Sequence, residues 1–136
     1  MIVNSNNSLL PGGGIHHIAV QTFDPEASLR LYRDVLGMRI VKETVTPQRS
    51  ITLLDIGDGS HVELVATPGA APGGGIAAGN NPLLHIALRT TDLRAVIEQV
   101  RSAGYEITVE PKEVRQATIA FFKGPNAELI EFYQTY

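Results

Sequence analysis

The triplet His-Ile-Ala occurs twice in this chain, once at His17 and once at His85. The two histidines are 68 residues apart, and the same offset separates Asp24 from Asp92. Self-similarity at a fixed offset predicts that the chain contains two copies of one supersecondary unit. This duplication constrains the fold strongly, because both copies must then form the same elements in the same order.

The first copy has the pattern of one strand, one helix and three further strands. Residues 15–21 alternate as a strand, and Asp24 with Pro25 supplies a helix N-cap followed by a proline at the first helical position. Leucines and Tyr32 follow at helical spacing until Gly37, which predicts the helix end. The three strands after it are predicted at residues 38–45, 51–56 and 61–66.

The second copy repeats this order. A strand at 84–89 precedes a helix capped by Asp92 and ended by Gly104, with apolar residues at 93, 96, 97 and 100. Three strands are predicted at 105–110, 117–123 and 127–133. The expected fold class is therefore α+β, with two tandem βαβββ modules.

Glycine- and proline-rich segments mark the expected domain organisation. Residues 1–14 read as a flexible tail, and residues 67–82 read as a linker. We expect a single domain over 15–136, with module one at 15–66 and module two at 83–136.

Composition narrows the class of function. The 136 residues carry a formal net charge of −3 without a basic stripe, which argues against nucleic-acid binding. There is no apolar run long enough to span a bilayer, so no membrane partner is expected and a cytoplasmic location is predicted. The absence of cysteine leaves histidine and carboxylate side chains as the strong candidate metal ligands.

Strand alternation predicts where the candidate ligands point. His17 shares a face with Ala19, and His85 shares a face with Ala87, in each case away from the helix. Each copy also has a glutamate that interrupts an apolar strand late in the module, Glu63 in the first and Glu128 in the second, 65 residues apart.

A buried carboxylate needs a partner or a metal ion, so this pattern predicts a metal site formed by two histidines and two glutamates. The predicted ligands are His17, Glu63, His85 and Glu128. Glu131 is expected on the opposite face from Glu128, although an error of register would exchange the two. His16 and His61 have no counterpart in the other copy and are interpreted as structural residues or neighbours of a ligand.

The segments that carry these residues resemble the vicinal oxygen chelate superfamily, and in particular glyoxalase I-like proteins. The resemblance covers about 15–133 and rests on five segments: 17–20 (HIAV), 28–38 (SLRLYRDVLGM), 62–64 (VEL), 85–88 (HIAL) and 121–131 (FFKGPNAELIE). It implies a cupped mixed sheet around a divalent ion held by the same four residues. Zn or Ni would be the first choice, with Mn, Co or Fe as other options.

The resemblance also implies a reaction. A full set of two histidines and two glutamates is similar to that of metal-dependent lyases or isomerases of glyoxalase I type, which act through a metal-stabilised enediolate. Glu128 would be the chief base and Glu63 its pseudo-symmetric partner. The expected substrate is a small oxygenated metabolite or an adduct of a thiol with an aldehyde. Glutathione-dependent members of the family tend to have an arginine at the position of Gln21. Arg89 occupies the equivalent position in module two. The resemblance therefore does not identify the thiol that forms the adduct.

Two other functions share this fold. A non-haem Fe(II) ring-cleaving dioxygenase would use His17, His85 and Glu128 and leave Glu63 without a role. A non-catalytic binding or resistance protein would use the cup without metal. In each case the partner is a small molecule. A homodimer is expected, because each module leaves sheet edges open.

Overall fold

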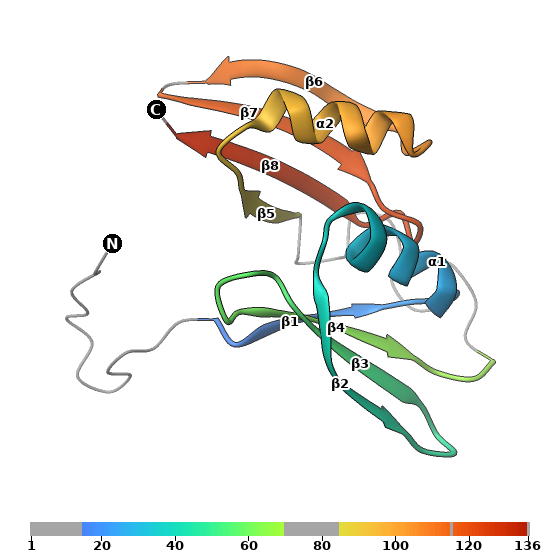
Figure 1. Ribbon diagram of the computed structural model, residues 1–136. Helices are drawn as coiled ribbons and strands as arrows, with labels where there is room; N and C mark the ends of the chain where they lie inside the picture. The colour runs from blue at the N-terminus through green and yellow to red at the C-terminus, as the bar shows by residue number, and fades with distance from the viewer. Residues whose placement is uncertain (1–14, 70–84, 115, 136) are drawn as a thin grey trace, which may run out of the picture.

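The computed structural model describes residues 15–69, 85–114 and 116–135 and contains two βαβββ modules (Figure 1). Module one consists of β1 (His17–Gln21), α1 (Pro25–Leu29) continued by the π-helical turn η1 (Arg30–Val35), β2 (Arg39–Val45), β3 (Ser50–Asp55) and β4 (His61–Ala66). Module two consists of β5 (Ile86–Arg89), α2 (Leu93–Ser102), β6 (Ile107–Val114), β7 (Ala117–Lys123) and β8 (Leu129–Thr135).

Each module forms its own four-stranded mixed sheet. The strand orders are β1-β4-β3-β2 and β5-β8-β7-β6, so the first strand of each module pairs in parallel with the last. The other pairings are antiparallel. This shared topology confirms the predicted duplication and the predicted fold class.

The helices begin where the capping residues predict. Asp24 accepts a hydrogen bond from the backbone N–H of Ala27 at 3.2 Å, and Asp92 accepts one from Ala95 at 3.2 Å. Gly37 follows the first helix with φ +76° and Gly104 follows the second with φ +97°, conformations that favour glycine. Local sequence chemistry therefore sets the ends of both helices.

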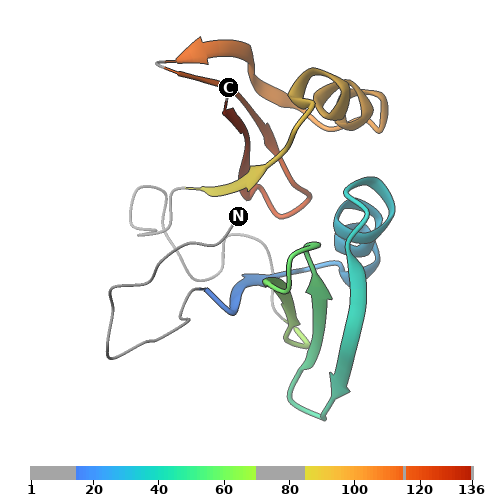
Figure 2. The ribbon, with the colours of Figure 1, turned by 60° about the vertical axis from the view of Figure 1, so that its left-hand side comes forward.

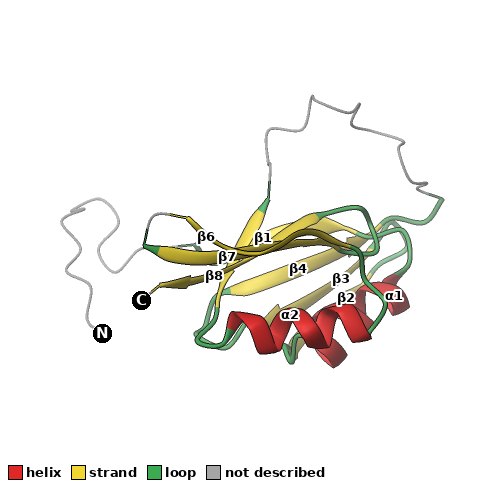
Figure 3. Ribbon diagram, turned by 90° about the horizontal axis from the view of Figure 1, so that it is seen from above, coloured by secondary structure: helices red, strands yellow, loops and turns green. Residues whose placement is uncertain are grey.

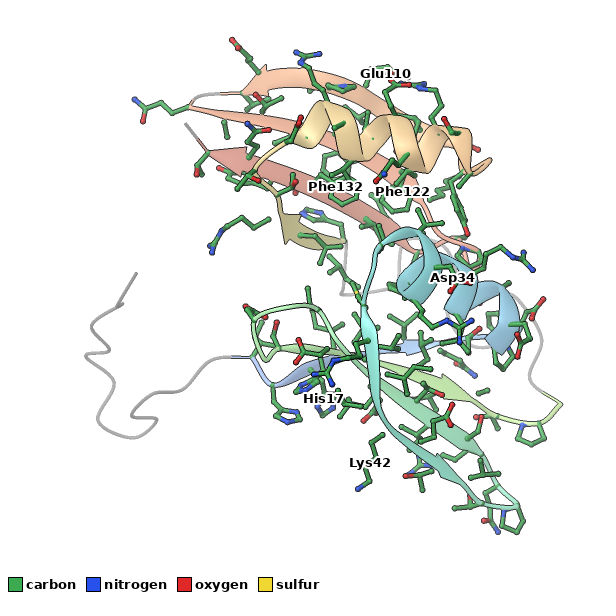
Figure 4. The ribbon with its side chains drawn as sticks, viewed as in Figure 1. His17, Asp34, Lys42, Glu110, Phe122 and Phe132 are labelled. Atoms are coloured by element: carbon green, nitrogen blue, oxygen red, sulfur yellow. The ribbon has the colours of Figure 1, made fainter. Side chains whose placement is uncertain are left out.

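One apolar core joins the two modules. It contains Leu31 and Leu54 of module one together with Ile97 of module two, all fully buried. Phe122 and Phe132 face α2 and stack with their ring centroids 5.4 Å apart (Figure 4). Both helices lie on the same side of the strands (Figures 2 and 3), so the opposite face of each sheet is left for other contacts.

Strands β6 and β8 differ most from the sequence-based prediction, since each begins and ends later in the chain. Strand β6 continues past Pro111, which is possible because β6 is an edge strand with an irregular register between Val109 and Lys112. Strand β8 begins at Leu129, two residues later than predicted, because Ala127 adopts a left-handed φ of +62° and belongs to the preceding turn.

The tail at 1–14 and most of the predicted linker at 67–82 lie outside the described residues. Within the described ranges, no helix has the length and apolar composition needed to cross a membrane.

The turn before β8 gives a stability prediction. Ala127 holds a left-handed conformation that glycine adopts without a steric penalty, so we expect Ala127→Gly to raise the free energy of unfolding by up to about 1 kcal/mol. The matched control is Gly59→Ala in the equivalent turn of module one, where φ is +93° and a β-carbon meets no atom within 4 Å. It should lower stability by about 1 kcal/mol through the backbone alone. Urea unfolding at one fixed protein concentration checks both, and a loss of stability in Ala127→Gly would contradict the interpretation.

Candidate metal centre

The first half-site consists of His17 on β1 and Glu63 on β4. Parallel pairing places Ala19 opposite Glu63, and alternation puts both on the same sheet face as His17. His17 Nε2 lies 3.6 Å from Glu63 Oε2. The side chains are 39% and 22% exposed, so this half-site is open to solvent.

The second half-site consists of His85, immediately before β5, and Glu131 on β8. Ala87 is opposite Glu131, and His85 Nε2 lies 3.0 Å from Glu131 Oε1. The side chain of Glu131 is only 9% exposed, and the His85 ring meets the Phe121 ring edge to face with centroids 5.3 Å apart. Burial and an aromatic neighbour hold this pair more firmly than the first.

The two half-sites are equivalent by register. In both modules the glutamate lies opposite the alanine of the His-Ile-Ala triplet. Glu63 and Glu131 are 68 residues apart, the offset that also separates His17 from His85. Each copy therefore places one histidine and one carboxylate together at equivalent register positions.

The prediction that Glu128 corresponds to Glu63 is wrong. Because β8 starts at Leu129, Glu128 lies in the turn before the strand and takes no part in the register with β5. Its Oε2 accepts hydrogen bonds from the Tyr32 hydroxyl at 3.0 Å and from Asn126 Nδ2 at 3.2 Å, and its Oε1 accepts one from the Asn126 backbone at 2.7 Å. The constant offset of 68 was the sequence signal for Glu131, whereas Glu128 departs from it by three residues.

Glu128 also affects its hydrogen-bond donor. Burial raises the pKa of the Tyr32 hydroxyl well above its ordinary value, and the charge and hydrogen bond of Glu128 raise it further. Tyr32 is 1% exposed, so its hydroxyl stays protonated and donates to Glu128.

The donor chemistry of each half-site fits a divalent ion. Two donor atoms about 2.1 Å from one ion are about 3.0 to 3.4 Å apart at octahedral or tetrahedral angles. The observed Nε2–Oε separations of 3.0 Å and 3.6 Å are close to this range. Among the residues that the structure describes, however, no three histidine or acidic side chains of one chain come together closely enough to hold a metal ion.

His16 and His61 lie beside the first half-site. The His16 ring centroid is 4.6 Å from that of His61, and His16 Nδ1 is 2.9 Å from His17 Nδ1. His61 Nδ1 lies 2.9 Å from the carbonyl oxygen of His16. This geometry agrees with their interpretation as neighbours that restrain His17.

The chain is similar in sequence to proteins named lactoylglutathione lyase. It is 33% identical over 128 residues to a protein from Haemophilus influenzae named lactoylglutathione lyase, and the alignment covers 88% of this chain and 91% of the relative.

Solved structures share the fold. A glyoxylase/bleomycin resistance protein/dioxygenase domain from Frankia sp. superposes with a TM-score of 0.80 at 19% identity, covering 91% of this chain and 93% of that one. Glyoxalase I from Zea mays gives a TM-score of 0.73 at 24% identity over 88% of this chain. The match spans only 44% of the maize chain, so this chain corresponds to less than half of that protein.

The family model described as the Glyoxalase/Bleomycin resistance protein/Dioxygenase superfamily matches residues 14–132, a range that includes all four half-site residues. Together with the two tandem βαβββ modules, this match shows that the chain belongs to that superfamily.

Proposed function

We propose that this protein is a divalent-metal-dependent lyase or isomerase of glyoxalase I type. The observation that carries the proposal is the pair of equivalent half-sites, each with a histidine and a glutamate within 3.6 Å on the sheet face opposite the core. The proposed ligands are His17, Glu63, His85 and Glu131. Glu131 replaces Glu128 in the set predicted from the sequence.

Two chains would complete the site. One chain supplies only two ligands at each place, whereas a stable site of this type needs three or four protein ligands. Strands β1 and β5, which carry or adjoin the two histidines, are both at the edges of their sheets. Edge strands are available for pairing with another chain, so we propose a homodimer in which each site combines the first half-site of one chain with the second half-site of its partner.

The bound ion would be Zn or Ni, with Mn, Co or Fe as other options, because the donor set contains only imidazole and carboxylate groups. When bound, such an ion would supply positive charge beside the substrate oxygens, which favours the development of negative charge on them. The chain itself supplies the proton transfer between neighbouring carbons, through a carboxylate that accepts and returns the proton.

The proton-transfer role falls to Glu131 or Glu63 in this proposal. Glu128 is unsuited to it, because both of its oxygens already accept hydrogen bonds from Tyr32 and Asn126. Glu131 is more buried than Glu63, 9% against 22% exposed, and its partner His85 packs against the Phe121 ring, so the Glu131 carboxylate is held the more firmly of the two. We therefore assign the principal role to Glu131.

The substrate class follows from the relatives. Because the Haemophilus influenzae protein is named lactoylglutathione lyase, an adduct of a thiol with an aldehyde is the first substrate to test. Gln21 and Arg89 leave the identity of the thiol open, so the assay should combine methylglyoxal with glutathione and with other low-molecular-weight thiols. No turnover with any of these thiols would contradict the lyase function.

The geometry favours this function over a ring-cleaving dioxygenase. A dioxygenase site of two histidines and one carboxylate would leave Glu63 without a role. Glu63 instead pairs with His17 in the same register that Glu131 has with His85. Four equivalent ligands are a better match to lyase or isomerase chemistry.

Metal content distinguishes the two candidate glutamates. We expect about one Zn or Ni ion per chain in the wild-type protein by native mass spectrometry, and loss of that ion in Glu131→Ala because a ligand is removed. Glu128→Ala is the matched control and should keep the ion at protein concentrations well above its dimer dissociation constant. Retention in Glu131→Ala together with loss in Glu128→Ala would overturn the assigned ligand set.

Mixed dimers test whether the site lies between chains. His17→Ala and His85→Ala each remove one half-site, so neither homodimer should hold the ion. After subunit exchange, a mixed dimer contains one site in which both halves are intact, and we expect one ion per mixed dimer. Isotope labelling of one variant separates the three dimers by mass.

Subunit exchange at random should make about half of the dimers mixed. Mixed dimers that form but bind no ion would show that the four ligands do not combine across two chains as proposed.

A further inference from the structure

The turn between β7 and β8, residues 124–128, binds module one through polar contacts. We call it the docking turn. Asn126 Oδ1 accepts a hydrogen bond from the backbone N–H of Phe23 at 3.1 Å, and Asn126 Nδ2 lies 3.1 Å from Ser28 Oγ. Tyr32 donates its hydroxyl hydrogen to Glu128 at 3.0 Å. These bonds join residues about 100 positions apart in the chain.

The module-one side of this contact is buried. Thr22, Ser28 and Tyr32 are 2%, 0% and 1% exposed. Ser28 Oγ donates to Thr22 Oγ1 at 2.7 Å, which extends the network from the docking turn to the end of β1. A buried polar group without a hydrogen-bond partner lowers the stability of the fold. The docking turn supplies the acceptor that the buried Tyr32 hydroxyl needs.

The docking turn is packed around the Glu128 side chain. A β-carbon at Gly124 would overlap the carboxylate of Glu128. The backbone N–H of Gly124 also donates to the Glu128 carbonyl at 2.8 Å. Glycine at 124 therefore leaves the space in which Glu128 reaches Tyr32.

The equivalent turn of module one lacks this contact. Asp58 and Ser60 stand 68 residues before Asn126 and Glu128, and they bond to each other: Asp58 Oδ1 accepts from the Ser60 backbone at 3.0 Å. These hydrogen bonds lower the pKa of Asp58 and leave it at the surface. The position equivalent to Tyr32 is Val100, which is in the apolar core. The docking contact is thus a feature of module two alone and not a property of the repeat.

We propose that Glu128 is a positioning residue that fixes module two against the helix of module one. By holding the two modules in one orientation, it sets how a chain presents its two half-sites to a second copy. This last step rests on the proposed function, whereas the docking contact does not.

A double-mutant cycle tests the contact in the metal-free protein. Tyr32→Phe and Glu128→Ala should each lower the urea midpoint, and the double variant should lose little beyond the larger single effect. We expect a coupling of at least about fivefold in the unfolding equilibrium constant, because the two groups bond directly. Tyr133→Phe, at an exposed tyrosine, is the control and should be additive with Glu128→Ala. Additivity of the Tyr32 and Glu128 effects would overturn the docking contact.

Gly124→Ala provides an independent test. It should lower the urea midpoint in the wild-type background, because the new methyl group displaces the Glu128 carboxylate. In the Glu128→Ala background the space is free, so the same change should have little effect. An equal loss in both backgrounds would contradict the packing argument.

The positioning role needs a readout that a general loss of stability does not change. In the metal-loaded protein, Glu128→Ala should raise the dimer dissociation constant about tenfold, measured by analytical ultracentrifugation. Ala117→Gly, at a buried position of β7 outside the core that joins the modules, is the control for a loss of stability without loss of docking. An effect of Glu128→Ala no larger than that of Ala117→Gly would overturn the positioning role.

The two proposals fail in different ways. If the wild-type chain is monomeric and binds no ion, the proposed function falls, and the double-mutant cycle alone decides the docking contact. If Glu128→Ala loses the ion while the cycle shows no coupling, Glu128 is a metal ligand and this inference is overturned.

Discussion

Parallel pairing of the first and last strands of each module is the constraint on which the candidate site depends. It sets Ala19 opposite Glu63 and Ala87 opposite Glu131, and strand alternation then places a histidine and a carboxylate on the face away from the core. Loss of this register by one residue would turn both glutamates into the core, where a charged group is costly. The sheet hydrogen bonds therefore determine both the fold and the chemistry of the half-sites.

The duplication is faithful in the strands and not in the turns. The half-sites repeat with one offset, whereas the turn before the last strand differs between the modules: Asp58 and Ser60 bond within their own turn, and Asn126 and Glu128 reach the other module. Symmetric half-sites suit a metal ion held between equivalent halves. The turns are not equivalent, because only the turn of module two forms hydrogen bonds with the other module. This single contact is enough to fix one orientation of the two modules.

Much of the fold was predictable from the sequence because its signals are local. Asp24, Asp92, Gly37 and Gly104 define the helix ends through capping and backbone conformation, and the structure confirms them. The choice of Glu128 failed because it depended on where β8 starts, and Ala127 gives no sequence signal of its left-handed conformation. The separation of the two half-sites within one chain is a tertiary property, which neither periodicity nor spacing encodes.

Anomalous diffraction from crystals of the metal-loaded dimer tests the central claim most directly, because it locates the ion and its ligands together. The account predicts one anomalous peak per chain, within coordination distance of His17 and Glu63 of one chain and of His85 and Glu131 of its partner. A peak coordinated by Glu128, or by ligands from a single chain, would contradict it.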